Sequence, residues 1–158
     1  MNKNIKIILA SDHAGFRLKE TIKSFLQEKG YAVEDVGAHE LKDGDDYPIY
    51  MTAAAMKVAK DLSGVTKAVI FGGSGQGEAM VANRFPGVRA VVYYGSTARS
   101  DLDIIRLPRE DNDANILSIG ARFVGEDDAK KAIEIWLDTP FSNEERHKRR
   151  IEQIDNIE

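Results

Sequence analysis

Five short apolar runs, separated by longer amphipathic stretches, are the feature that most restricts the fold of this 158-residue chain. Runs of this length are typical of buried strands, and their alternation with helix-length segments is typical of βαβ units with a parallel sheet. The runs cover residues 5–10, 32–36, 68–71, 90–94 and 116–119. The sequence therefore predicts an α/β fold in a single domain, 1–158: a doubly wound, Rossmann-like sheet of five parallel strands with helices on both faces and a C-terminal helix.

Apolar residues that recur every three to four positions predict the helices between these strands. The predicted helices cover 16–26, 47–62, 77–84 and 126–137, with a further helix in the tail from Ser142. Ser142 and Glu145 have the spacing of a capping box, which predicts the start of the tail helix. The segment from 95 to 114 mixes a helical pattern with Pro108, so its boundaries are left open.

The charge balance argues against a polyanionic partner. The chain has 22 Lys and Arg against 26 Asp and Glu, a net charge of −4, so we expect neither nucleic acid nor a membrane surface to bind it. The absence of cysteine excludes a thiolate base and thiolate metal ligands. The longest N-terminal apolar run, 7–10, is too short for a signal-peptide core or a membrane span, so we expect a cytoplasmic protein.

The first candidate site follows the first strand, at Ser11-Asp12-His13-Ala14-Gly15. Open α/β sheets bind ligands in the crevice at the carboxyl ends of their strands. Asp12 and His13 would project into that crevice, where the N-terminus of the next helix favours a bound anion. The alternative is that Asp12 only caps this helix, and the residues alone leave both interpretations open.

The second candidate site is Gly72-Gly73-Ser74-Gly75-Gln76-Gly77-Glu78, directly after the third strand. Its four glycines allow backbone N–H groups to approach a ligand closely, which is typical of a loop that binds anionic oxygens. A dinucleotide fingerprint is excluded because its third glycine would fall on Glu78, and a P-loop is excluded because Glu78 stands where the lysine must be. A tight turn without a ligand is the alternative.

The third candidate site is the basic run Arg146-His147-Lys148-Arg149-Arg150 in the tail. Arg146 and Arg150 are four residues apart, so they share one face of a helix and their guanidinium groups could both bind a phosphate. The alternative is a solvated charged surface, because most runs of this kind contribute little.

A metal site has little support in the sequence. The acidic segment 43–46 lacks the EF-hand pattern, and we interpret it as a solvated loop or as support for the crevice. Ligand-like spacing is also missing from the histidines, which are His13, His39 and His147. We therefore expect neither a metal nor an organic cofactor.

Together these residues resemble the ribose-5-phosphate isomerase B family, which includes related galactose- and allose-phosphate isomerases, over nearly the whole chain. The motifs that carry the resemblance are residues 11–15, Asp46-Tyr47-Pro48, the glycine loop through Ala82-Asn83-Arg84, Pro86-Gly87-Val88-Arg89-Ala90, Asn112-Asp113-Ala114-Asn115, Gly120-Ala121-Arg122 and residues 146–150. One branch of the family uses a cysteine base at the start of the glycine loop, where this chain has Gly72. The other branch uses a glutamate at the end of the loop, and Glu78 matches it.

The resemblance implies a role for each matching residue. Glu78 is the implied catalytic base. The implied substrate-binding residues are Asp12, His13, Ser74, Gly75, Gln76, Gly77 and Asn112, with Arg122, Arg146 and Arg150 anchoring the phosphate. Asp111 stands where the family has a histidine thought to assist opening of the sugar ring, and an ionised aspartate accepts a proton but does not donate one. Because Asp111 occupies this position, it is a second candidate catalytic residue. The segment 96–108 is longer than the matching segment of the family.

The resulting hypothesis is conversion of ribose 5-phosphate to ribulose 5-phosphate through an enediolate, with Glu78 as base. Asn112 precedes the fifth strand, toward the sheet edge opposite Asp12 and Glu78, so we expect a homodimer or a dimer of dimers with shared active sites. Three alternatives stay open: an isomerase for a tetrose or hexose phosphate, a non-catalytic sugar-phosphate sensor suggested by Asp111, and a flavodoxin-like mononucleotide binder, which the acidic Glu78 disfavours.

Overall fold

The order of the strands in the sheet decides which loops of this protein meet. The computed structural model describes residues 4–95 and 103–157. The strands are β1 (Lys6–Ser11), β2 (Ala32–Asp35), β3 (Thr66–Gly72), β4 (Ala90–Tyr93) and β5 (Ile116–Gly120), in the order β2-β1-β3-β5-β4. Every neighbouring pair is parallel, and Gly72 at the end of β3 lies opposite Gly120 at the end of β5. The predicted five-stranded parallel sheet is confirmed.

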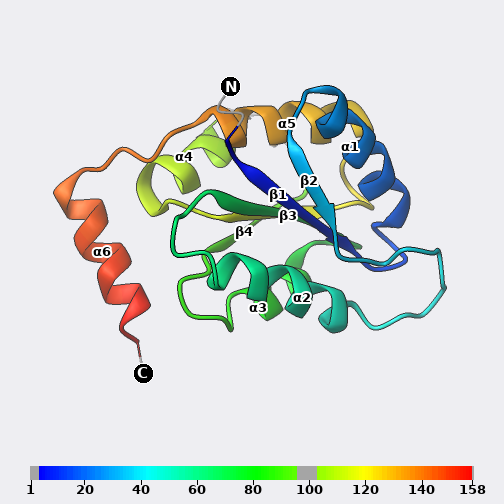
Figure 1. The fold of residues 1–158 in the computed structure, drawn as a ribbon, viewed down its shortest axis with the longest axis horizontal. Helices are drawn as coiled ribbons and strands as arrows, with labels where there is room; N and C mark the ends of the chain where they lie inside the picture. The colour runs from blue at the N-terminus through cyan, green and yellow to red at the C-terminus, as the bar shows by residue number, and fades with distance from the viewer. Residues whose placement is uncertain (1–3, 96–102, 158) are drawn as a thin grey trace.

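Helices cover both faces of the sheet (Figure 1). One face carries α1 (Phe16–Glu28), α4 (Asp103–Asn112) and α5 (Glu126–Asp138), and the other carries α2 (Tyr47–Ala59) and α3 (Gln76–Ala82). The last helix, α6 (Glu145–Asp155), lies to the side of these layers and packs against α4. The predicted doubly wound arrangement with a C-terminal helix is therefore confirmed.

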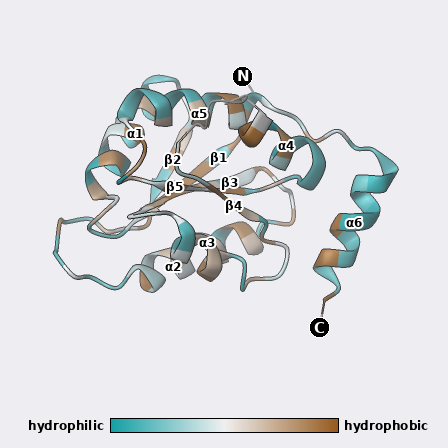
Figure 2. Ribbon diagram, turned by 180° about the vertical axis from the view of Figure 1, so that it is seen from behind, coloured by the Kyte–Doolittle hydropathy of each residue, from teal (hydrophilic) through white to brown (hydrophobic). Residues whose placement is uncertain are grey.

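The inner strands β1, β3 and β5 bury side chains on both faces, as their largely apolar sequences require. Ile7 and Leu9 of β1 belong to the layer with α1 and α5, whereas Ile8 and Ala10 belong to the layer with α2. Trp136 of α5, the only tryptophan, is fully buried in the first layer. Figure 2 shows hydrophobic colouring along the strands and hydrophilic colouring on the outer side of α1. The loops at the ends of these strands are therefore held by a sheet packed from both sides.

Helix α2 ends earlier than predicted because a side chain competes for the backbone. The Asp61 carboxylate accepts hydrogen bonds from the N–H groups of Ser63 and Thr66, at 2.9 and 2.6 Å, and turns the chain after Ala59. Leu62, the last residue of the predicted helix, is 99% exposed. Local hydrogen bonds of this kind favour turns over helix, and the apolar pattern does not reveal them.

The capping box predicted for the tail helix is wrong. Glu144 is the N-cap of α6, and no side chain caps the helix. Asn143 has a left-handed conformation, with φ of 58°, so the chain turns between Ser142 and the helix. The Ser142 hydroxyl accepts the Glu144 N–H at 3.5 Å, outside the helix. His147 instead holds α6 in place: it is buried, and its Nδ1 lies 2.9 Å from the carbonyl oxygen of Asp111.

The segment whose boundaries were left open contains α4, with Pro108 inside the helix. Residues 96–102, which include most of the longer segment 96–108, lie outside the described residues. In the sheet β5 lies between β3 and β4, and β4 forms the edge. In the described part of the chain, no helix has the length and apolar character needed to cross a membrane.

Candidate active site

The glycine loop between β3 and α3 is held in one shape by β5 and the turn after it. Gly75 has φ of 80°, a left-handed conformation that favours glycine. Its carbonyl oxygen accepts a 2.7 Å hydrogen bond from the buried hydroxyl of Ser118 in β5. The N–H of Ala121 donates to the carbonyl oxygen of Gly72 at 2.8 Å. The shape of the loop therefore rests on contacts within the chain.

Two backbone donors of this loop have no partner within the described residues: the N–H groups of Gly73 and Ser74. The Ser74 hydroxyl accepts the Gln76 N–H at 3.3 Å. Gly77 has no room for a side chain, because a Cβ there would lie 2.8 Å from the Tyr47 hydroxyl. A rigid turn with unpaired N–H groups is suited to binding anionic oxygens.

Glu78 lies in the first turn of α3 and folds back over the start of the loop. Its side chain is 4% exposed. A Cβ on Gly72 would lie 1.8 Å from Glu78 Oε1, so the carboxyl group fills the space that a side chain at residue 72 would take. Gly72 is therefore required by the position of Glu78. A large side chain at residue 72 would displace the Glu78 carboxyl group from this position.

The environment of Glu78 favours proton transfer. Burial raises the pKa of its carboxyl group above the usual value, and the nearby Asp12 carboxylate acts in the same direction. The backbone N–H groups of Glu78 and Gly75 and the Arg122 guanidinium oppose this shift in the pKa without reversing it. A carboxylate with a raised pKa is a stronger base than a solvated one.

Asp12 follows β1 and shapes the turn into α1. Its side chain is buried, and Oδ1 accepts the Gly15 N–H at 3.1 Å. Gly15 is the N-cap of α1 and the helix has no side-chain cap, so the alternative that Asp12 is the cap is wrong. Asp12 Oδ2 lies 3.9 Å from Nδ1 of His13. The Asp12 carboxylate therefore faces both His13 and Glu78.

His13 is held by Asp45 from the acidic segment before α2. Asp45 Oδ1 accepts the backbone N–H of His13 at 2.9 Å and lies 2.8 Å from Nδ1 of its ring. The hydrogen bond that the Asp45 carboxylate accepts from the ring raises the pKa of His13 above its usual value, and burial opposes this. One ligand atom each from Asp12, His13 and Asp45 lie within 4.8 Å of one another, so this group could hold a cation. The interpretation of segment 43–46 as support for the crevice is confirmed for Asp45.

Arg122 completes the group at the carboxyl ends of the strands. Its guanidinium lies against the glycine loop, because a Cβ on Gly73 would be 3.2 Å from Arg122 Nη1. Its backbone N–H also donates to the Gly73 carbonyl oxygen at 3.1 Å. The structure thus brings Asp12, His13, Glu78 and Arg122 together, as the sequence predicted, at the ends of β1, β3 and β5.

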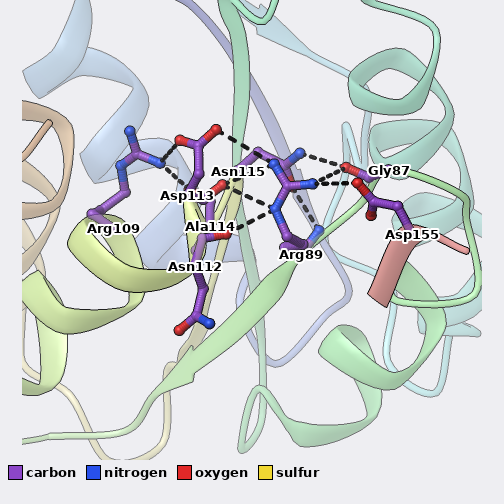
Figure 3. A network of polar contacts seen from close by, with 8 residues as sticks. All are labelled: Gly87, Arg89, Arg109, Asn112, Asp113, Ala114, Asn115 and Asp155. Carbon is purple, nitrogen blue, oxygen red and sulfur yellow. Dashed lines mark hydrogen bonds and ion pairs between the residues drawn. The ribbon is translucent and has the colours of Figure 1, made fainter. Parts of the chain in front are cut away.

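Asn112 lies at the other end of the sheet. Its carbonyl oxygen accepts a 2.8 Å hydrogen bond from Nε of Arg89, which precedes β4 (Figure 3). Figure 3 shows the Asn112 side chain pointing away from this network. Because β5 has five residues, about 16 Å separate Asn112 from the cluster around Glu78. One chain does not bring the two together.

Arg146 and Arg150 are also remote from the glycine loop of their own chain. Both lie on α6, at the side of the molecule (Figure 1). The Arg146 side chain is 58% exposed and pairs with Glu144 at 2.8 Å. Asp111, the second candidate catalytic residue, lies at the end of α4, and its Oδ1 is 3.5 Å from Nδ1 of His147. The predicted site residues therefore form two separate groups within one chain.

Tyr47 and Ser118 shape the site, and the sequence assigned neither of them a role there. Tyr47 was noted only as part of a family motif, and its hydroxyl packs against Gly77. Ser118 lies inside an apolar strand, where a single buried hydroxyl is the only signal of a special role. A buried polar residue in a strand requires a hydrogen-bond partner, and that requirement could have indicated Ser118.

Comparison with known proteins places this arrangement among sugar isomerases. The profile of the family described as Ribose/Galactose Isomerase matches residues 7–154. The chain belongs to the ribose/galactose isomerase family. It is 37% identical to ribose-5-phosphate isomerase B of Escherichia coli, over 97% of this chain and 96% of that protein. It is 34% identical to the enzyme of the same name from Mycolicibacterium paratuberculosis, over 98% of this chain and 92% of that protein.

Solved structures of the ribose/galactose isomerase family have the same fold. The ribose 5-phosphate isomerase of Thermotoga maritima matches with a TM-score of 0.86 and 36% identity, over 97% of this chain and 99% of that one. The enzyme of Mycoplasma genitalium with bound ribulose-5-phosphate matches with a TM-score of 0.87 and 33% identity, over 96% of this chain and 94% of that one. This member of the family is thus an aldose–ketose isomerase of phosphorylated sugars.

The contact between Glu78 and Gly72 predicts the effect of one added methyl group. In Gly72→Ala the new Cβ displaces the Glu78 carboxyl group, and we expect turnover to fall about hundredfold, since a misplacement of about 1 Å can cost that much. The rate of isomerisation checks this, with the thermal midpoint measured alongside. Gly125→Ala is the matched control, because a Cβ there meets nothing within 4 Å. Turnover of Gly72→Ala equal to that of the control would contradict the placement of Glu78.

Proposed function

We propose that this chain interconverts ribose 5-phosphate and ribulose 5-phosphate, with Glu78 carrying the proton between neighbouring carbons. The observation that carries this proposal is the buried Glu78 carboxyl group, folded over Gly72 with its pKa raised and next to a loop with unpaired N–H groups. The relatives named ribose-5-phosphate isomerase B, and the related structure with bound ribulose-5-phosphate, support this choice of substrate.

In the proposed reaction Glu78 removes the proton from C2 of the open-chain aldose. The electrons of the broken C–H bond form the C1–C2 double bond of an enediolate, and the carbonyl electrons move onto oxygen. The N–H groups of Gly73 and Ser74 donate hydrogen bonds to this oxygen as it becomes negative. Each well-placed donor typically stabilises such a transition state by about 3 kcal/mol. Glu78 then returns the proton to C1, while a hydroxyl proton moves between the two oxygens to leave the ketose.

The substrate phosphate would be bound by arginines from two chains. Arg122 supplies a guanidinium beside the loop of its own chain. Arg146 and Arg150 lie on α6, far from that loop, and Asn112 lies at the opposite end of the sheet. We therefore propose a homodimer or a dimer of dimers, in which α6 and the end of α4 complete the site of a second copy.

Asp111 is proposed to act at the opening of the sugar ring. It stands beside Asn112 at the end of α4, where the family places a histidine. As a carboxylate, Asp111 would accept the proton of the anomeric hydroxyl on C1. A second acidic group would give a proton to the ring oxygen as the bond between C1 and that oxygen breaks. This step is where the chain departs from the family.

Replacing the base tests the proposed reaction directly. In Glu78→Gln we expect turnover of ribose 5-phosphate to fall at least about hundredfold while substrate still binds, because the amide has no basic oxygen for the proton. Coupled assay of ribulose 5-phosphate and calorimetric binding measure the two effects. Near-normal turnover would remove Glu78 from this role.

The stability of the same variant serves as its folding control. The folded state raises the pKa of Glu78, so its contribution to stability is present below the pKa of the unfolded chain and is lost as pH rises through the folded pKa. Glutamine has no charge to bury. We therefore expect the unfolding midpoint of Glu78→Gln at neutral pH to equal or exceed that of the natural chain.

Mixed dimers test whether active sites are shared. Co-expressed Glu78→Gln and Arg146→Met/Arg150→Met chains should regain about a quarter of natural activity, because half of randomly formed dimers are mixed and each holds one intact shared site. The two purified chains, each assayed alone, are the controls. Activity of the mixture no higher than that of either variant would show that each site lies within one chain.

Asp111 also favours a second candidate, an isomerase for a tetrose or hexose phosphate, since ring opening differs among these sugars. A panel of pentose, tetrose and hexose phosphates, assayed with the natural chain and with Asp111→His, separates the two. We expect ribose 5-phosphate to be the best substrate and Asp111→His to accelerate it several-fold. A hexose or tetrose phosphate with the highest kcat/KM would favour the second candidate, and binding without turnover across the panel would indicate a sensor.

A further inference from the structure

A lysine at the amino end of β3 is buried without a partner. Lys67 is 7% exposed, and its amino group has no hydrogen-bond or ion-pair partner among the described residues. It is the second residue of β3, whereas Gly72, over which Glu78 folds, is the last. Five residues along a strand span about 16 Å. Lys67 is therefore remote from Glu78, and the proposed reaction does not use it.

Lys67 lines two cavities. The larger, of about 340 Å³, is also lined by Arg109 and by residues 137–140, at the end of α5 and in the turn after it. The smaller, of about 210 Å³, lies toward the end of α2. A water molecule takes up about 30 Å³ in the liquid, so the larger cavity has room for an anion of several atoms.

Arg109 brings a second buried cation to the larger cavity. It is 5% exposed, and its Nη1 donates to Asp113 Oδ1 at 2.6 Å and to the Ala114 carbonyl oxygen at 2.8 Å. Its Nε is buried and has no hydrogen-bond partner among the described residues. Figure 3 shows Arg109 and Arg89 on the two sides of Asp113, and Arg89 Nη2 donates to Asp113 Oδ2 at 3.4 Å. The two guanidinium groups thus share this carboxylate, and Lys67 forms no ion pair with it.

We propose that the larger cavity is a binding site for a small oxyanion such as inorganic phosphate, held between the amino group of Lys67 and Nε of Arg109. A buried charge without a partner and a buried donor without an acceptor both cost stability. One anion in the cavity would satisfy both groups through charge-assisted hydrogen bonds. Because Arg109 belongs to the last turn of α4, the bound anion would also stabilise the end of that helix.

The charges around Lys67 leave room for an anion. Burial lowers the pKa of Lys67 to about 8, and the guanidinium of Arg109 acts in the same direction. Arg89 adds to this effect, whereas the carboxylates of Asp113 and Asp61 oppose it. At neutral pH the amino group is therefore still an ammonium, and it is a buried cation that no carboxylate of the described residues neutralises directly.

Two further carboxylates line these cavities and have other neighbours. Asp61, in the smaller cavity, accepts hydrogen bonds from the backbone beyond it. Asp138, in the larger one, is exposed and raises the pKa values of Lys29 and Tyr31, so it lies near those side chains. Neither carboxylate forms an ion pair with Lys67.

Lys67→Met removes the charge and keeps the length of the side chain. Lys131→Met is the matched control, because Lys131 is exposed on α5. Each protein is titrated calorimetrically with sulfate, phosphate or acetate at constant ionic strength in sodium chloride, and its unfolding midpoint is recorded with and without each anion. Sulfate keeps its charge between pH 7 and 9.5, so a change in its affinity reports the protein. Any anion that binds at the glycine loop binds in all three proteins and cancels in the comparison.

We expect the natural chain and Lys131→Met to bind one more sulfate per chain than Lys67→Met. At an about hundredfold excess over the dissociation constant, their unfolding midpoints should rise by roughly 5–10 °C more than that of Lys67→Met. The additional site should weaken at least about tenfold between pH 7 and 9.5, because Lys67 loses its proton above its pKa of about 8. Tighter binding of acetate than of sulfate or phosphate would identify the oxyanion as a carboxylate.

Stability without an added oxyanion separates this role from a structural one. The folded state lowers the pKa of Lys67, so its unpaired charge destabilises the fold at neutral pH, and this cost is lost as the pH rises from about 8 toward the pKa of the unfolded chain. In sodium chloride at pH 7, Lys67→Met should therefore unfold at the same temperature as the natural chain or at a higher one.

The natural chain also provides a test that needs no variant. In NMR of lysine labelled at Cε, one signal should titrate near pH 8, far below the value of about 10.4 that is usual for lysine. Saturating sulfate should raise the pKa of that signal by about one unit, because a bound anion stabilises the ammonium.

Two results would overturn the proposal. The first is equal sulfate stoichiometry and an equal rise in the unfolding midpoint for the natural chain and Lys67→Met. The second is a Lys67 signal whose pKa does not change with sulfate, which applies even if Lys67→Met does not fold. None of these measurements involves the turnover of a sugar phosphate, so failure of the proposed reaction would leave them unchanged.

Discussion

The protein depends on one close contact, the packing of the Glu78 carboxyl group over the Cα of Gly72. The carboxyl group occupies the space of a missing side chain, so it is withdrawn from water at the end of a central strand. Burial of a carboxyl group costs stability, and here it raises the pKa, which makes the side chain the stronger base that the proposed reaction requires. The surrounding groups, from the left-handed Gly75 to the hydroxyl of Ser118, keep the loop in the shape that this contact requires.

The sheet places the two halves of the proposed site at opposite ends of one chain. Residues that follow β1 and β3 meet at the carboxyl ends of the strands, whereas Asn112 precedes β5 and lies at the amino ends. The length of a strand separates them, and no side-chain rotation closes such a distance. Helix α6, anchored through the buried His147, carries the basic residues away from the layers of its own chain. The proposed shared site would therefore follow from the parallel strands, and catalysis would then depend on assembly.

Much of the fold, and the position of the glycine loop, could be predicted from the sequence, for reasons visible in particular residues. All strands except β2 are largely apolar runs, which are typical of buried parallel strands. Glu78 stands out because it replaces the lysine of a phosphate-binding loop. The tail cap was predicted wrongly because the left-handed Asn143 separates Ser142 from the helix. Leu62 was misplaced because Asp61 hydrogen-bonds to the backbone beyond it. These are local hydrogen-bond choices that hydrophobic periodicity does not encode.

By itself, the sequence determined the strand and helix types and the glycine loop, because periodicity and residue chemistry depend on neighbours along the chain, while its resemblance to a family named Glu78 as the candidate base. Only the tertiary structure decided that β5 lies inside the sheet, that Glu78 fills the space above Gly72 and that Asp45 holds His13. The last contact joins residues 32 positions apart, on either side of a strand and a helix. The physical reason is that contacts between distant residues follow from how the layers pack, and packing depends on the shape of the whole core.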